Sequence, residues 1–143
     1  MTLHDVAVRV RDVSHQFGEH GDPQHVRALL DTSLDIARGE LLCLIGPSGC
    51  GKSTLLNVIG GLMTPTSGTV HVGNTLVHGP LPREIAFVFQ ESALFPWSTV
   101  LENVVLGMTF QGVPKFQREE RARRALEAVG LTEFSDHYPG QLS

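Results

Sequence analysis

The chain has 143 residues and a formal net charge of −4, with 41% hydrophobic and 18% charged residues. This length suits one compact core, and the balance of apolar and charged residues is that of a folded globular protein. A net negative charge gives no electrostatic reason to expect a nucleic-acid partner. No apolar run approaches the ~20 residues of a membrane-crossing helix, and the first five residues do not resemble a secretion signal, so a cytoplasmic location is expected.

The two cysteines, Cys43 and Cys50, are expected to be reduced thiols in that compartment. A disulfide is therefore not expected. A metal site is not expected either, because no further cysteine or histidine stands at ligand spacing. Cys43 belongs to an apolar run and is predicted to lie in the core.

The first part of the chain predicts β-strands. Apolar and polar residues alternate from residue 6, which predicts a half-buried strand ending near Phe17. A second alternating run predicts a strand with Leu30, Thr32, Leu34 and Ile36 on one face. The run 41–45 is apolar without alternation, which predicts a strand covered on both faces, as in a parallel sheet. Two further short strands are predicted at 69–72 and 85–89.

Helices are predicted at three places. Apolar residues recur at helical spacing from 53 to 62, directly after a glycine-rich loop. Thr99 and Glu102 fit a capping box, which predicts a helix start. A longer helix is predicted over 115–129, followed by Gly130 as a stop signal. Its apolar face is predicted to hold Ala122, Ala125, Leu126 and Val129.

The loop between the predicted strand and helix carries the chemistry. Residues 46–53 fit the pattern G-x-x-x-x-G-K-[ST], the phosphate-binding P-loop. Gly49 and Gly51 let the backbone approach a phosphate chain, and the following helix directs its positive end toward it. Lys52 is expected to reach the β- and γ-phosphates, and the Ser53 hydroxyl to coordinate Mg²⁺. The residues predicted to bind ATP here are Gly46, Ser48, Gly49, Cys50, Gly51, Lys52, Ser53 and Thr54.

A chance match of a glycine-rich turn is the alternative, and the predicted strand before the loop and helix after it argue against that. Together with its neighbours, the loop resembles the ATPases of the ATP-binding cassette (ABC) transporters over the whole chain. The matching segments are 48–56, 65–70, 87–90 followed by 94–97, and 99–104. The resemblance implies an α/β fold of the P-loop NTPase type, with an antiparallel β part at the N-terminus. It implies a nucleotide-binding core over 1–95 and the beginning of a helical subdomain over 96–143.

The resemblance also implies roles for single residues. Phe17 stands where the family stacks an aromatic ring on adenine, although a core Phe at a strand end is the alternative. His15 is expected to be solvated. Gln90 stands at the Q-loop position, where its amide binds Mg²⁺ and the attacking water. The implied catalytic residues are Lys52 and Gln90, and the implied Mg²⁺ ligands are Ser53 and Gln90.

The implied function is ATP hydrolysis coupled to solute import, by a subunit on the inner face of the cell membrane. Its partners would be transmembrane permease subunits, contacted through residues 91–97, a second ATP-binding subunit, and indirectly a periplasmic solute-binding protein. A buried core turn is the alternative for 91–97. Residues 94–100 most resemble importers of nitrate, sulfonate, taurine and related small anions.

The 143-residue chain itself is expected to bind nucleotide weakly and not to hydrolyse it. It ends at Leu142 and Ser143, two residues into the family's signature motif, before the groups that position the attacking water. Exposed apolar surface and self-association are also expected. The alternatives are another P-loop enzyme, such as a small-molecule kinase or a GTPase, and a non-catalytic fragment that binds a permease or a full-length cassette.

Overall fold

The computed structural model describes residues 6–18, 25–91 and 93–142, and the chain divides into two compact units, 1–88 and 89–143. The single core expected from the length is therefore wrong, because each unit has buried residues of its own. Unit 1 contains β1 (Val6–Phe17), β2 (Val26–Ala37), α1 (Lys52–Ile59), β3 (Ser67–Val72) and β4 (Thr75–Leu76). Unit 2 contains α2 (Val100–Phe110), α3 (Lys115–Ala128) and the short 3-10 helices η1 (Thr132–Phe134) and η2 (Pro139–Gln141).

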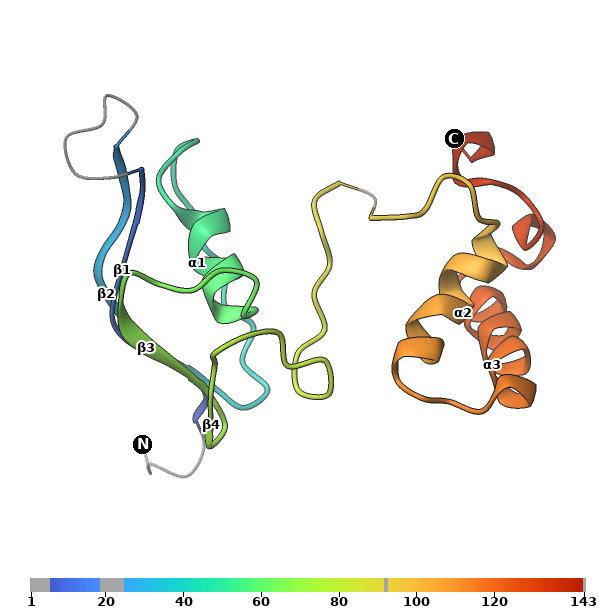
Figure 1. Ribbon diagram of the computed structural model, residues 1–143, viewed down its shortest axis with the longest axis horizontal. Coiled ribbons are helices and arrows are strands. Elements are labelled where there is room, and N and C mark those ends of the chain that lie inside the picture. The colour runs from blue at the N-terminus through green and yellow to red at the C-terminus, as the bar shows by residue number, and fades with distance from the viewer. Residues whose placement is uncertain (1–5, 19–24, 92, 143) are drawn as a thin grey trace. The chain divides into compact units, whose positions relative to one another are not determined.

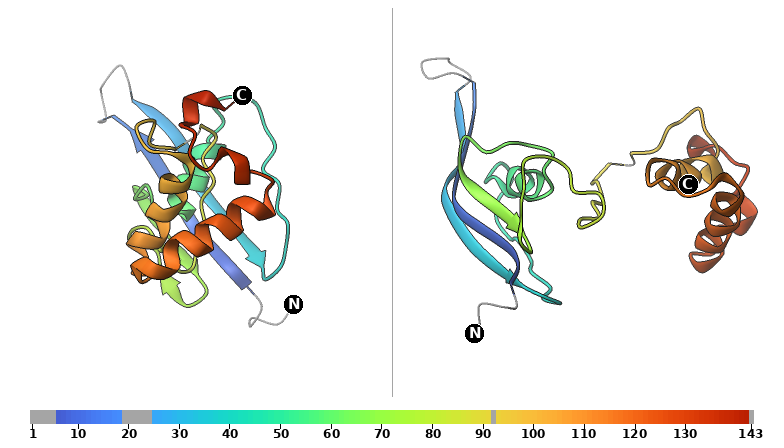
Figure 2. Two further views of the ribbon diagram at one scale, coloured as in Figure 1. Left: turned by 90° about the vertical axis from the view of Figure 1, so that its right-hand side faces the viewer. Right: turned by 60° about the horizontal axis from the view of Figure 1, so that its bottom comes forward.

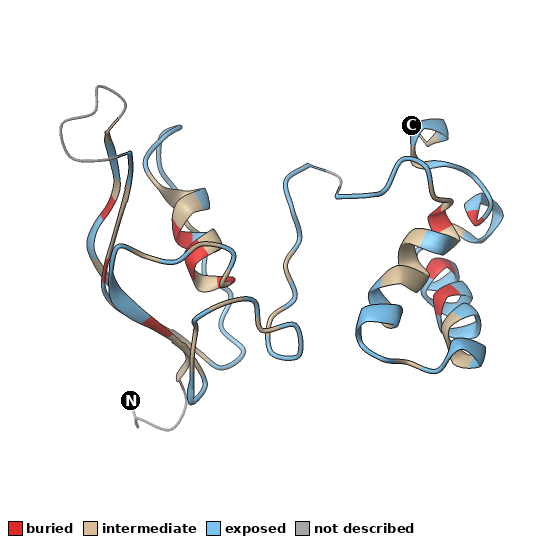
Figure 3. Cartoon of the chain, viewed as in Figure 1, coloured by how far each residue is buried: buried red, intermediate tan, exposed pale blue. Residues whose placement is uncertain are grey.

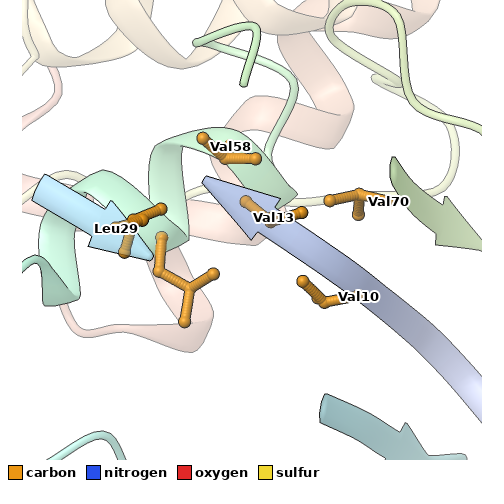
Figure 4. Close-up of a cluster of buried hydrophobic side chains, with 6 residues drawn as sticks. Val10, Val13, Leu29, Val58 and Val70 are labelled. Carbon is orange, nitrogen blue, oxygen red and sulfur yellow. The ribbon is translucent and has the colours of Figure 1, made fainter. Parts of the chain in front are cut away.

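Unit 1 is built on an antiparallel sheet with the strand order β2-β1-β3-β4. In the central strand β1, Val10 pairs with Leu34 of β2 on one side and with Val70 of β3 on the other. Helix α1 lies against one face of this sheet (Figures 1 and 2). The buried side chains between sheet and helix form the core in Figure 4: Val10, Val13, Leu29, Leu55, Val58 and Val70.

Two irregularities in the β1–β2 pair change which side chains face the core. Asp12 and Asp31 have the left-handed backbone angles φ 48° and φ 39°. The Ser33 hydroxyl donates a hydrogen bond to Asp12 Oδ1 at 2.9 Å, and the Ser14 hydroxyl donates one to Asp31 Oδ1 at 3.1 Å. Each irregularity shifts the strand register, which exchanges the inward and outward positions.

The predicted core face of β2 is therefore correct only after Asp31. Before it, Leu29 is buried and Leu30 is 61% exposed, so the prediction that Leu30 shares a face with Leu34 is wrong. Beyond Asp31, Thr32, Leu34 and Ile36 are half-buried, as predicted, and so is Ala37 at the end of the strand.

The predicted strands at 41–45 and 85–89 are wrong for the described residues. Neither segment has regular secondary structure, and neither pairs with a described strand. Leu41, Ile45 and Val88 are at least 90% exposed, and Cys43 is exposed where a core position is predicted. An apolar run becomes a buried strand only when other strands and helices cover both of its faces, and here the cover is partial. Leu44 packs against the core of unit 1 and Phe87 lies beside Gly60, while the neighbouring positions stay exposed. The described sheet is antiparallel throughout.

Unit 2 is a pair of packed helices with its own small core. Val100, Ala122, Leu126 and Ser135 are buried. Figure 3 shows buried positions in red on both helices of this unit. The predicted capping box is confirmed, since the Thr99 hydroxyl accepts from the Glu102 amide at 3.2 Å and the Glu102 carboxylate accepts from the Thr99 amide at 2.8 Å. None of the described helices has the length and apolarity needed to cross a bilayer.

The apolar face of α3 is narrower than predicted. Ala122 and Leu126 are buried, whereas Ala125 and Val129 are exposed. These two side chains instead line an apolar groove of about 350 Å³ within unit 2, together with Leu94, Val100, Asn103, Val104, Leu126, Leu131 and Leu142. Gly130, with φ 72°, follows the end of the helix as predicted.

Candidate functional site

The glycine-rich loop curls directly before α1 in unit 1. Gly49 and Gly51 have φ 81° and φ 93°, the left-handed conformation that turns successive amides toward one concavity. A Cβ atom on Gly51 would lie 2.4 Å from the Ala28 carbonyl oxygen of β2. Only glycine therefore fits at this position, and the close contact fixes the loop against β2.

The loop leaves several backbone N–H groups free at the start of α1. The helix begins at Lys52, its N-cap is Gly51, and no side chain caps it. Among the described residues, none accepts a hydrogen bond from the amides of Gly49, Gly51, Lys52 or Ser53. Unpaired amides at a helix N-terminus form a site for an anion, because the helix dipole adds to the positive potential.

The Lys52 ammonium lies across the same loop. Its Nζ donates to the carbonyl oxygens of Gly46 at 2.9 Å and Pro47 at 2.8 Å. Its third donor reaches only Cys50 Sγ, at 3.5 Å, and sulfur is a weak acceptor. No described carboxylate forms an ion pair with Lys52. A positive charge held at the loop without a counter-charge is suited to an anionic ligand.

The first turn of α1 supplies two hydroxyl groups beside this charge. Ser53 is exposed and Thr54 is half-buried. The described residues contain no cluster of three His, Cys, Asp or Glu side chains that could hold a metal by itself. A hydroxyl such as that of Ser53 is an oxygen ligand of the kind that Mg²⁺ takes alongside phosphate oxygens.

Phe17 and His15 lie at the end of β1. Phe17 pairs with Val26 and Gln16 with Arg27, so the contact of Gly51 with Ala28 puts the loop beside this end of the hairpin, as Figure 1 shows. The Phe17 side chain is 42% exposed, which rules out the core alternative. The Phe17 and His15 ring centroids are 4.7 Å apart at an interplanar angle of 80°. His15 is half-buried rather than solvated as predicted.

Gln90 and the aromatic segment after it belong to unit 2. Gln90 is exposed and follows the apolar run 85–89. Phe95 and Trp97 are 41% and 72% exposed, with ring centroids 5.3 Å apart. These exposures show that the buried-turn alternative for this segment is wrong. Of the predicted site residues, those of the loop and Phe17 belong to unit 1, whereas Gln90 belongs to unit 2.

Asn103 is the residue that the sequence analysis overlooks. From the first turns of α2 its side chain returns to the preceding loop. Its Nδ2 donates to the carbonyls of Phe95 at 3.1 Å, Ser98 at 3.1 Å and Thr99 at 2.9 Å, and its Oδ1 accepts from the Phe95 amide at 2.8 Å. Asn is uncommon inside helices because it competes for backbone groups, and this is the signal that could have revealed its role.

A family model described as ABC transporter matches residues 29–143. The chain belongs to the ABC transporter family. The α/β fold class and the resemblance to this family are thereby confirmed. The matched residues include the whole P-loop, Gln90 and both helices of unit 2.

Relatives within the ABC transporter family agree with this assignment. Taurine import ATP-binding protein TauB from Roseobacter denitrificans is 42% identical over 134 residues, which are 94% of this chain and 49% of the relative. TauB from Chromobacterium violaceum is 49% identical over 81% of this chain and 44% of its own length. An uncharacterized ABC transporter ATP-binding protein from Methanocaldococcus jannaschii is 42% identical, over 96% of this chain and 51% of that protein. The chain thus spans about half the length of these curated relatives.

A solved structure supports the same fold. It is a dimeric ATP-binding cassette in a post-hydrolysis state bound to ADP and Pi, with 35% sequence identity and a TM-score of 0.81. The similarity covers 95% of this chain and 63% of that chain.

Proposed function

We propose that this chain binds MgATP at residues 46–54 as part of the ATP-binding subunit of an ABC importer for small sulfonates such as taurine. The observation that carries the nucleotide site is the Lys52 ammonium held on the carbonyls of Gly46 and Pro47, next to four amides that no described residue accepts from. The taurine class is supported by the names of the two TauB relatives.

Each group of the loop has a separate task in this proposal. The amides of Gly49, Gly51, Lys52 and Ser53 donate to phosphate oxygens, and the ammonium balances their negative charge. Mg²⁺ bound with the nucleotide further spreads the charge of the β- and γ-phosphates. We assign the exposed Ser53 hydroxyl as one of its ligands, and the exposed Phe17 ring as the apolar face for the adenine base.

Hydrolysis needs more than this phosphate-binding loop. Family membership supports ATP hydrolysis in general, and we assign Gln90 the task of orienting water and Mg²⁺. The loop residues 46–54 include no carboxylate or histidine that could activate a water molecule. The 143-residue chain is therefore expected to bind nucleotide without turning it over, and to require a second ATP-binding subunit in the transporter.

Unit 2 is proposed to face the permease on the inner side of the membrane. Leu94, Phe95 and Trp97 expose 46%, 41% and 72% of their surface, next to the apolar groove lined by Val104 and Leu131. Exposed aromatic and aliphatic side chains beside an apolar groove are characteristic of a protein interface.

The nucleotide site is tested by titrating MgATP into the chain and into Lys52→Ala by calorimetry. The substitution removes charge-assisted hydrogen bonds, so the dissociation constant should rise roughly 10- to 100-fold. Lys115→Ala is the matched control, because Lys115 is the other lysine of the chain and lies in unit 2. Equal affinity of wild type and Lys52→Ala would refute the proposal, and binding that does not prefer ATP over GTP would favour another P-loop enzyme.

A further inference from the structure

We infer that His15 is a positioning residue that holds the Phe17 ring in place for the nucleotide base. The inference rests on the proposed nucleotide site and extends it to a residue outside the phosphate loop. It starts from the row of side chains that share one face of β1 after the irregularity at Asp12.

This row leads from the core to the surface. Val13 is fully buried, His15 is half-buried and Phe17 is 42% exposed. Residues two apart in a strand project on the same face, so each side chain borders the next. His15 therefore lies between the fixed core of unit 1 and the ring at the end of the strand.

The geometry of the two rings supports a positioning role. Their centroids are 4.7 Å apart and their planes are nearly perpendicular, at 80°. A perpendicular neighbour restricts rotation of the Phe17 ring, and it can cover at most one of the two ring faces. The other face of the Phe17 ring remains available for stacking on the nucleotide base. A ring whose orientation is already fixed loses less conformational entropy when it stacks.

Packing, rather than hydrogen bonding at Nδ1, holds the imidazole in this pose. His15 Nδ1 is buried and has no hydrogen-bond partner among the described residues. A buried polar atom without a partner is unfavourable, so a polar contact at this atom does not explain why the ring is there. A phenyl ring could fill the same place, which gives the inference a sharp test.

The test compares MgATP with magnesium tripolyphosphate, which offers the phosphates without the base. Calorimetry on the 143-residue chain should give a tighter dissociation constant for ATP. In His15→Ala the ATP constant should rise about fivefold, the cost of ordering one aromatic side chain, while tripolyphosphate binding stays unchanged. His15→Phe should restore ATP binding, because the ring pair is preserved.

His71→Ala is the matched control. His71 lies in the same sheet and also has a buried Nδ1 without a described partner. It pairs with Arg9, which is eight residues, or about 26 Å, from Phe17 along β1. This variant should bind both ligands like the wild type.

Three results would overturn the inference. They are an unchanged ATP constant in His15→Ala, an equal loss of tripolyphosphate binding in that variant, and equal affinity of the wild type for the two ligands. In each of these cases, binding of tripolyphosphate by the wild type would still support the proposed phosphate site. If the wild type binds neither ligand, the proposed nucleotide site fails as well.

Discussion

Gly51 meets two separate constraints in the phosphate loop. Its φ of 93° lies in a region that side chains disfavour by about 1–2 kcal/mol, and a Cβ would also collide with the Ala28 carbonyl at 2.4 Å. Gly39 shares the first constraint, with φ 77°, but has open space around it. A comparison of the two glycines therefore separates the cost of the backbone conformation from the cost of the close contact.

We predict that Gly51→Ala destabilises unit 1 clearly more than Gly39→Ala does. The second substitution should cost about 1–2 kcal/mol, the penalty of the left-handed conformation alone. The first must also move the loop or β2 by part of an ångström, which weakens phosphate binding too. Urea unfolding followed by far-UV circular dichroism measures the difference, and equal losses in the two variants would show that the contact with Ala28 is unimportant.

At the level of elements, β1 and β2 are joined by an ion pair as well as by their backbones. Arg11 Nη1 and Nη2 contact the two carboxylate oxygens of Asp35 at 2.6 Å and 2.7 Å. The hydrogen bond from Arg11, with the charges of Arg11 and Arg9, holds the pKa of Asp35 below its ordinary value. Stability from this group is present above the ordinary carboxyl pKa of about 3.9, and it is lost as the pH falls through the lowered value.

Asp35→Asn should therefore lower the thermal midpoint of unit 1 at neutral pH and have little effect at a pH below the lowered pKa of Asp35, where both the folded and unfolded carboxyl groups are protonated. Hydrogen exchange should show the loss in β1 and β2 and not in α2 and α3. Asp136→Asn serves as the control, because Asp136 forms no ion pair with a described residue. A loss of equal size at both pH values would contradict the role of the ion pair.

The loop before α2 depends on Asn103 in a similar way. Three of the four hydrogen bonds of this side chain use its amide NH₂ group. Asn103→Asp keeps the shape but replaces those donors with an acceptor, which would face the carbonyls of Phe95, Ser98 and Thr99. The loop that carries Trp97 should then loosen.

Trp97 is the single tryptophan of the chain, so its fluorescence reports on this loop directly. We predict a change in emission maximum and stronger quenching by acrylamide in Asn103→Asp, with ATP affinity unchanged. Asn57→Asp, in α1 of unit 1, is the control. Identical quenching in wild type and Asn103→Asp would mean that the loop does not need these hydrogen bonds.

For the whole molecule, the exposed apolar segments are the most unusual feature. Leu41, Ile45 and Val88 are 90%, 94% and 92% exposed. Side chains of this kind favour self-association of the 143-residue chain. Ile45→Lys and Val88→Lys should reduce binding of a hydrophobic dye and shift sedimentation toward the monomer, without lowering stability.

Val10→Lys provides the contrast, because Val10 is fully buried and a charge there should unfold unit 1. If the Ile45 and Val88 variants lose stability as Val10→Lys does, these positions are covered in solution. If dye binding and sedimentation do not change, the segments do not drive association.

Features that are determined by neighbouring residues could be predicted from the sequence, whereas features that depend on contacts between distant segments could not. The capping box at Thr99, the strands β1 and β3 and the helix directly after the glycine-rich loop follow from local patterns, and the structure confirms them. Phosphate binding by that loop stays a prediction. The strands predicted at 41–45 and 85–89 are wrong, because a strand also needs partners that the run itself does not encode. Leu29 rather than Leu30 lies in the core because of an irregularity held by serine–aspartate hydrogen bonds between two strands. The alternation of residues along one strand cannot reveal such bonds.

The central claim is that residues 46–54 hold the phosphates of a nucleotide through their backbone. Amide ¹H–¹⁵N spectra of the chain, recorded while MgATP is added, test it most directly. The resonances of Gly49, Gly51, Lys52 and Ser53 should shift most, that of Gly39 should stay in place, and the shifts should vanish in Lys52→Ala. Shifts that centre outside 46–54, or that persist at full size in Lys52→Ala, would contradict the claim.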